Sequence, residues 1–334
     1  MKCLDLSVLK KFSCEIWKNL KLSTRMKSRR LIRSKCSVGS ARGHFSEDDV
    51  YFPHMLRDGA IATWSDIVPS LESVRENARP SIVNSFASFP YCVYSPAFAG
   101  NYGRSKATYL CLGDAKIGIV NAEGKNPSSL IFPLSEIDEI EMGTELLSSW
   151  IAFHVRGQRR AVFFNSVSKP YYTRFVDAFR SDRESKRSAD SLLTPQELDH
   201  YFSDLKKLDF KYDTYPRVAL ENRHPSAIFY HPETQIHPSI FGARVISSYL
   251  LLTASWILYA FSEARIIRYA HTANYSMVIR YIPLDADLKL HQAGAKEDYA
   301  IHLYEKSSTR LLEIPVAPAQ SATFSEFCQK SGIS

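Results

Sequence analysis

The residues of this chain best suited to chemistry are basic side chains that lie between β-rich runs. Residues 156–160 read Arg-Gly-Gln-Arg-Arg and separate two such runs, which predicts the tip of a basic hairpin. Guanidinium groups bind phosphate and carboxylate groups well, so this tip can contact a phosphate or an acidic partner, and a plain solvated turn is the alternative. Further basic residues are placed to line a strand face. The candidate binding residues are Arg156, Arg159, Arg160, Lys116, Arg265 and Arg268.

Histidines offer a second kind of chemistry, metal binding. Three His-Pro pairs begin at His224, His231 and His237, and three imidazoles are able to hold zinc. Their spacing matches no standard zinc site, and His-Pro pairs commonly mark turns. We therefore predict no metal and keep these three residues as the alternative. His154 and His302 occupy near-equivalent positions in two β-rich runs, which predicts a structural role in a sheet.

The sequence contains none of the common catalytic motifs. There is no G-x-S-x-G, no H-E-x-x-H and no G-x-G-x-x-G. Residues 100–106 fail the spacing of a phosphate loop, and a strand follows them where such a loop needs a helix. Glu136, Asp138 and Glu139 read as ordinary loop and edge charges. We predict a protein that is not an enzyme, with no catalytic residues and no cofactor.

The elements that must position these residues occur twice. Residues 113–120 match residues 262–269 without a gap, and the match continues at a similar offset to the end of the chain. A fixed offset held this long indicates two copies of one small domain. The further matches pair 132–134 with 282–284, 150–153 with 299–302, and 175–179 with 324–327.

Each copy predicts short antiparallel strands that end in one helix. Period-two alternation with short turns indicates the strands, and apolar residues at helical spacing indicate the helix. The predicted fold class is α+β and mainly antiparallel β, with two partial barrels that are each closed by a C-terminal helix. The first strands are expected at 91–94, 108–112, 116–120 and 130–134 in copy one, and at 227–230, 256–261, 265–269 and 277–284 in copy two.

This pattern resembles the bacterial pleckstrin-homology-like (PH-like) domains. That family has a hairpin of the type acidic-x-Arg-Ile-Ile, as in residues 263–267, and a Pro-Leu-acidic stretch, as in residues 283–285. Two more strands and a final helix follow. The resemblance implies two tandem PH-like domains with a general role in binding or scaffolding, and it implies no catalytic residues. Copy two departs from the family in a long insertion at 233–244.

The stretch between the copies predicts a linker that contains a helix. Thr194 can cap this helix, Pro195 fits its first turn, and Glu197 completes a capping box. The predicted organisation is a basic, disordered tail at 1–45, a helical lead-in at 46–84, PH-like domain 1 at 85–180, the linker at 181–223 and PH-like domain 2 at 224–334.

The positive charge of the chain is concentrated at its start. The net charge is +7, yet residues 1–45 hold 12 Lys and Arg against Asp5 and Glu15, and the rest holds 30 basic against 33 acidic residues. We therefore predict no nucleic-acid partner for the globular part. Leu9, Phe12 and Ile16 recur at helical spacing among lysines, so the tail can lie on an anionic membrane surface. A transit peptide, a disordered tail and a start at Met26 remain open.

Residues 245–261 form the longest uncharged run of the chain. The run is shorter than the roughly 20 residues of a spanning helix, and it contains four hydroxyl residues. We predict two buried strands there, with a transmembrane helix as the alternative. The six cysteines show no C-x-x-C and no framework spacing, which indicates a reducing, cytoplasmic setting.

These features together predict a non-enzymatic tandem PH-like protein that binds or scaffolds. Its partner is an unknown protein, with an anionic membrane surface as a further contact through residues 1–45. The alternative is a ligand-binding protein or an enzyme that uses the cleft between the two copies. The oligomeric state stays open.

Overall fold

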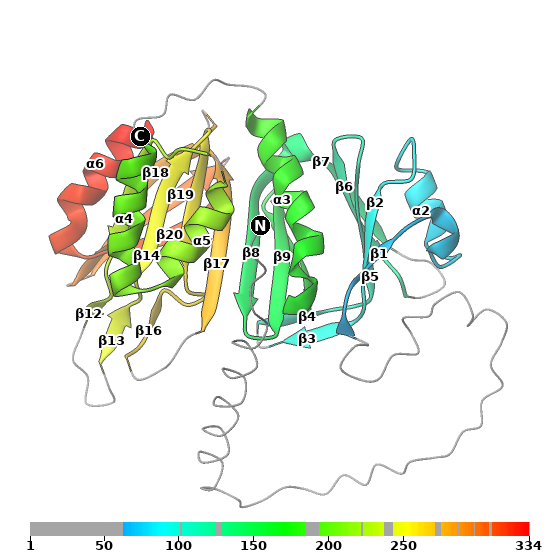
Figure 1. Cartoon of the computed structure of the whole chain (residues 1–334), viewed down its shortest axis with the longest axis horizontal. Helices are drawn as coiled ribbons and strands as arrows, with labels where there is room; N and C mark the ends of the chain where they lie inside the picture. The colour runs from blue at the N-terminus through cyan, green and yellow to red at the C-terminus, as the bar shows by residue number, and fades with distance from the viewer. Residues whose placement is uncertain are drawn as a thin grey trace, which may run out of the picture. The chain divides into compact units, whose positions relative to one another are not determined.

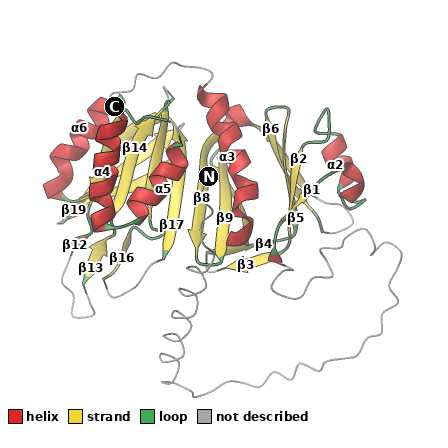
Figure 2. Cartoon of the chain, viewed as in Figure 1, coloured by secondary structure: helices red, strands yellow, loops and turns green. Residues whose placement is uncertain are grey.

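The computed structural model describes residues 63–100, 102–123, 128–184, 194–221, 223–236, 243–270, 275–285, 288–296, 298–306 and 309–333. The chain divides into two units, residues 1–49 and 50–334, and everything described belongs to the second unit. The predicted basic tail therefore lies outside the described residues. Figures 1 and 2 show the arrangement of the elements.

The first half of the described unit consists mostly of strands and ends in a long helix. A short strand and a short helix come first, two meanders of strands follow, and α3 closes the half. The elements are β1 (Asp66–Val68), α2 (Arg79–Val83), β2 (Tyr91–Ser95), β3 (Phe98–Gly100), β4 (Gly103–Ser105), β5 (Thr108–Gly113), β6 (Lys116–Asn121), β7 (Ser129–Pro133), β8 (Ile137–Glu145), β9 (Ser148–Val155), β10 (Gln158–Asn165) and α3 (Lys169–Glu184).

The second half begins with two helices and then repeats the order of meander, meander and helix. The elements are α4 (Pro195–Leu208), α5 (Lys211–Leu220), β11 (Ala227–His231), β12 (Thr234–Ile236), β13 (Arg244–Ile246), β14 (Tyr249–Ala254), β15 (Ile257–Ser262), β16 (Ile267–Tyr269), β17 (Ser276–Pro283), β18 (Leu288–Lys296), β19 (Tyr299–Lys306), β20 (Thr309–Val316) and α6 (Ser321–Ser331).

One sheet contains strands from both halves. Its order is β10-β9-β8-β17-β15-β14-β11, and β8 and β17 are antiparallel neighbours from Ser276 opposite Glu145 to Tyr281 opposite Ile140. The first half also has the sheet β1-β2-β5-β6-β7, and the second half has β18-β19-β20. The predicted α+β, mainly antiparallel class is confirmed, and none of the sheets in the described ranges is a closed barrel.

Within this shared sheet, β14 is buried on both faces, which explains the uncharged run at 245–261. Leu250 and Leu252 of β14 belong to a core cluster that includes side chains of α3, α4 and α5. Tyr249 and Leu251, the alternate residues, belong to a second cluster that includes α6. A strand covered on both faces is apolar throughout instead of alternating. The predicted buried strands are present as β14 and β15, and no helix in the described part is long and apolar enough to cross a membrane.

The second half repeats the order of the late elements of the first, but the sequence match is shifted by one strand early in copy two. In copy one, Asp114 and Ala115 form the turn between β5 and β6 with φ values of 50° and 54°. The corresponding turn in copy two lies between β14 and β15, where Ser255 and Trp256 have φ values of 49° and 63°. The sequence match placed this turn at residues 262–263 instead, because Ser255-Trp256 contains no Gly or Asp to mark it. Residues 265–269 contribute only β16, which pairs with β13 outside the shared sheet.

Two predictions on the segments around copy one differ in outcome. The linker helix begins as expected, because the Thr194 side chain accepts from the Glu197 backbone N–H while the Glu197 carboxylate accepts from the Thr194 N–H. The described part of the predicted helical lead-in at 46–84, residues 63–84, is helical only in part. Within its described residues, β1 pairs with β2 and only α2 is an α-helix. Ile67 and Val68 are β-branched and suit a strand.

Candidate functional site

Three of the six candidate binding residues lie together, and three do not. Arg156, Arg159 and Arg160 belong to the hairpin of β9 and β10, as predicted. Arg156 and Gly157 form its turn with positive φ values of 50° and 75°, a conformation in which glycine carries no steric penalty. Arg156 Nη2 lies 2.7 Å from the Glu136 carboxylate, and both groups are accessible to solvent.

The other three candidates, Lys116, Arg265 and Arg268, lie apart from this hairpin tip. Lys116 is the first residue of β6 and lies opposite Pro133 of β7. Arg265 is exposed in the segment before β16. Arg268 forms ion pairs with Glu263 at 2.9 Å and Glu233 at 2.6 Å, and it also donates to the Ser247 hydroxyl. Arg268 therefore serves the fold of the second half.

A groove lies between β7 and the β9–β10 hairpin, and we call it the hairpin groove. It consists of a pocket of about 500 Å³ and an adjoining pocket of about 210 Å³, which share Leu130 and Arg160 in their walls. The larger pocket is lined by strands β6, β7 and β10 and by Lys106, which precedes β5. Ile119 and Leu130 give it an apolar part.

The hairpin groove is basic. Lys106, Arg159 and Arg160 line the larger pocket, and no acidic residue does so among the described residues. Lys106 and Arg160 are exposed, and neither forms an ion pair with an acidic residue of the described ranges. The guanidinium of Arg160 donates to the side-chain oxygen of Gln158. The groove thus offers two cations that no acidic residue of the described ranges neutralises.

Arg159 connects the hairpin groove to a buried group of charges, which we call the ion cluster. Arg159 Nη2 lies 2.8 Å from Glu141 of β8. Arg280 of β17 pairs with Glu139 and with Glu141 of β8, each at 2.7 Å. The Trp150 indole N–H donates to Glu141 over 2.5 Å. The ion cluster therefore lies where β8 and β17 join the two halves.

The two carboxyl groups of the ion cluster have opposite pKa shifts. Burial raises the pKa of Glu139 to about 7, although Arg280 acts against this, because the side chain is fully buried and Glu141 is negative beside it. Burial also acts to raise the pKa of Glu141, but the charges of Arg280 and Arg159 outweigh it and lower that pKa to about 2. Glu139 is thus poised to hold a proton near neutral pH, whereas Glu141 stays ionised.

His154 of β9 completes the ion cluster. Burial lowers its pKa to about 4, and the positive charges of Arg280 and Arg159 contribute. Its Nε2 lies 4.0 Å from Glu139 Oε2, and both of these buried atoms are without a hydrogen-bond partner. Donor atoms of Glu139, Glu141 and His154 lie within 4.8 Å of one another, as ligands of a metal would. Guanidinium groups, however, already contact both carboxylates, so the negative charge is neutralised without a metal.

The ion cluster was not predicted from the sequence. The prediction that Glu139 is an ordinary loop or edge charge is wrong. Glu139 is 0% exposed and lies inside the shared sheet. One available signal was the alternation of Glu139 and Glu141 with apolar Ile140 and Met142, which places both acids on one face of a strand. Arg280 within the apolar run of β17 was another.

The three His-Pro histidines do not converge in the described part of the chain. His231 is buried, its Nδ1–H donates to the Pro232 carbonyl over 2.7 Å, and its Nε2 accepts from the Ala317 N–H over 3.2 Å. Both ring nitrogens are therefore used by the fold, and burial lowers the pKa of His231 to about 4. His224 is exposed, and His237 lies outside the described residues.

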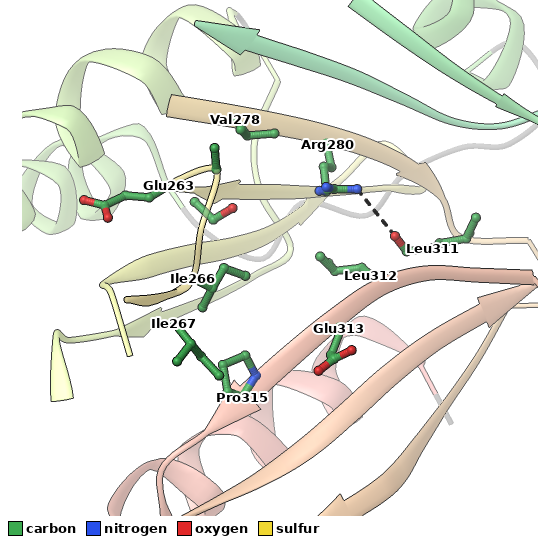
Figure 3. A pocket seen from close by; sticks show the side chains of 11 residues that line it. Glu263, Ile266, Ile267, Val278, Arg280, Leu311, Leu312, Glu313 and Pro315 are labelled. Atoms are coloured by element: carbon green, nitrogen blue, oxygen red, sulfur yellow. Dashed lines mark hydrogen bonds between the residues drawn. The ribbon is translucent and has the colours of Figure 1, made fainter. Parts of the chain in front are cut away.

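A further pocket of about 290 Å³ lies in the second half, between β17, β20 and the segment around β16 (Figure 3). Arg280 projects into it and donates to the Leu311 carbonyl over 3.5 Å, as the dashed line in Figure 3 marks. Glu263 and Glu313 also line it, so this pocket carries acidic as well as basic groups. Where the halves meet, β8 and β17 are antiparallel neighbours in one sheet.

No protein-family model matches this chain, and no curated protein matches it, so the assignment of a function rests on the geometry described above.

Proposed function

We propose that the protein is a non-catalytic binding module built from two PH-like halves, and that its hairpin groove binds an acidic segment of a partner protein. The observation that carries this proposal is the pair of exposed cations, Lys106 and Arg160, in the larger pocket of the groove. This pocket has a volume of about 500 Å³, and no described acidic residue lines it. A surface of this kind attracts carboxylates and speeds the encounter with an acidic partner.

The remaining wall of the groove supports a polypeptide as the occupant. Ile119 and Leu130 offer apolar contacts, and Ser128, Ser129 and Asn121 offer hydrogen-bonding groups. A peptide can use all three kinds of group along its length, whereas a lone phosphate has no apolar part to contact Ile119 and Leu130. The wall of the larger pocket contains hydroxyl groups but no His, Cys or carboxylate beside them among its described residues, which supports binding over nucleophilic catalysis.

The test measures binding of a fluorescein-labelled peptide of alternating Glu and Val to the full chain by anisotropy. Reversing the charges of the groove in a Lys106→Glu, Arg160→Glu variant should weaken binding about tenfold or more. Arg310→Glu is the matched control, because Arg310 is an exposed residue on the corresponding hairpin of the second half. This control should bind like the natural chain.

The comparison of variants in one full chain cancels the attraction from the basic residues at 1–45, and about 0.15 M salt reduces it. An equal loss in the Arg310→Glu control, or no peptide binding at all, would overturn the proposal. Vesicles that contain anionic lipid give the second arm of the test. Binding to them that needs Lys106 and Arg160, without peptide binding, would replace the protein partner with a membrane.

A further inference from the structure

Strand β7 has an open edge beside the hairpin groove. It is the last strand of the sheet β1-β2-β5-β6-β7, and within the described residues only β6 pairs with it. Ser129 and Leu130 of β7 are exposed. Unpaired edges of this kind are templates for the addition of a further strand.

The second half contains the same strand with its edge occupied. β17, like β7, is the last strand of a meander, and both end in the motif apolar-Pro-Leu, at residues 132–134 and 282–284. The preceding hairpins also agree, because each has a two-residue turn with positive φ. The free side of β17 is covered by β8 of the first half, which pairs with it in antiparallel register. One edge of this type therefore already accepts a strand within this molecule.

The strand that covers β17 has a distinctive charge pattern. Glu139 and Glu141 of β8 are two residues apart, so both side chains lie on one face, where Arg280 of β17 contacts each at 2.7 Å. Counting back from the shared proline, the position of Arg280 corresponds to Leu130 of β7. At β7 the cations are supplied instead by Arg160 and Lys106, which line the same pocket as Leu130.

Register identifies the backbone groups that are available at the open edge. The Asn121 N–H donates to the Ser128 carbonyl over 2.9 Å, so this residue pair is bonded across β6 and β7. Bonding alternates along an antiparallel pair, which turns the N–H and C=O groups of Ser129 and Ile131 away from β6. These groups point to the open edge.

We propose that the acidic segment bound by the hairpin groove adds to the open edge of β7 as an antiparallel strand, with acidic side chains at alternate positions facing Arg160 and Lys106. This inference rests on the proposed function and specifies its ligand: an extended peptide recognised by its backbone and by every second side chain. Main-chain hydrogen bonds to Ser129 and Ile131 supply affinity, and the cations select the acidic sequence.

A second copy of this chain is a poorer occupant than an acidic partner. The strand that corresponds to β8 in the second half is β18. Counted from the first residue of each strand, the positions of Glu139 and Glu141 hold Leu290 and Gln292. β18 also carries Lys289, and its pairing with β19 is shifted between Gln292 and Gly294. A basic, irregular strand does not complement the cations of the hairpin groove.

The test compares the peptide of alternating Glu and Val with the same peptide carrying N-methyl groups on alternate amides. Methylation removes the N–H groups of one edge and keeps the charge, so binding should fall about tenfold or more when that edge faces β7. On the protein, Ser129→Pro removes an outward N–H at an exposed position, and Ser129→Ala keeps it. We expect the proline variant to bind at least about tenfold more weakly than the alanine variant.

Hydrogen exchange on the full chain provides a readout that does not depend on any variant. Bound peptide should slow exchange of the Ser129 and Ile131 amides. If the methylated peptide binds equally well and these amides are not protected, while Lys106→Glu, Arg160→Glu still weakens binding, strand addition is wrong and the groove binds carboxylates by charge alone. If neither peptide binds, the proposed function fails as well.

Discussion

β7 and β17 end corresponding meanders in the two halves, yet they have different surroundings. β17 is covered by β8, and its Arg280 is bound to two buried carboxylates. β7 is open, its Leu130 is 38% exposed, and the nearby Lys106 and Arg160 form no ion pair with an acidic residue of the described ranges. The difference separates two settings of one kind of edge. In the second half the cation is paired within the fold, and in the first half the cations have no acidic partner among the described residues, which is the basis of the proposed binding.

The largest expected difference between the halves is the loss of stability when one cation of each is replaced. Arg280→Met leaves Glu139 and Glu141, which are 0% and 3% exposed, without their shared partner. Removing one side of a buried ion pair costs about 3 kcal/mol or more, because the remaining charge is buried and uncompensated. We expect a loss of this size in the free energy of unfolding, measured by urea denaturation near pH 8.

Arg160→Met is the matched control for this experiment. The same side chain is removed from an exposed site, so the stability should change by less than about 0.5 kcal/mol. Equal losses in the two variants would contradict the distinction between a structural and a free cation. A small loss in Arg280→Met alone would mean that the ion cluster does not hold the halves together.

The dependence of stability on pH tests the ion cluster more finely. The pKa of Glu139 is raised from 4.5 to about 7 in the folded chain, so its contribution is complete below pH 4.5 and is lost as pH rises through 7. His154 has the opposite sign, because its pKa is lowered from 6.5 to about 4 and its contribution is lost as pH falls through that range. The Glu139→Gln variant removes the pH-dependent contribution of Glu139 and leaves that of His154.

The natural chain should lose stability between pH 5 and pH 8 as Glu139 ionises, and Glu139→Gln should not. We therefore expect the difference in free energy of unfolding, variant minus natural chain, to be about 2 kcal/mol larger at pH 8 than at pH 5. Glu313→Gln makes the same change at a more exposed glutamate of β20 and provides the background. A gain no larger than that background would show that Glu139 is ionised at both pH values.

Much of the local structure could be predicted from the sequence. Short β-rich runs bounded by turns identified β2, β7, β9 and β10, and the residues Thr194, Pro195 and Glu197 identified the start of α4. These signals are local, because strand alternation and helix capping depend on neighbours within a few residues.

The joining of the halves could not be predicted in the same way. Arg280 and Glu139 are separated by 141 positions, and no local pattern states which strand pairs with β8. The burial of Glu139 follows from that pairing, and so does its pKa. The basic hairpin tip was recognised in advance, but the cation Lys106 and the apolar wall of the hairpin groove come from strands that only the fold brings together.

The smallest expected effect comes from giving β7 the residue that β17 has. Leu130→Arg places a guanidinium at the position that corresponds to Arg280, facing the hairpin groove. Because Leu130 is partly exposed, stability should stay within about 0.5 kcal/mol. A partly exposed pair with a carboxylate contributes up to about 1 kcal/mol, so the peptide of alternating Glu and Val should bind about fivefold more tightly in the anisotropy assay.

Leu147→Arg adds the same charge at the exposed turn between β8 and β9 and serves as the control. If both variants bind the peptide more tightly by the same factor, the peptide responds to net charge and not to the edge of β7. If Leu130→Arg alone gains, the edge of β7 recognises an acidic strand as the edge of β17 does.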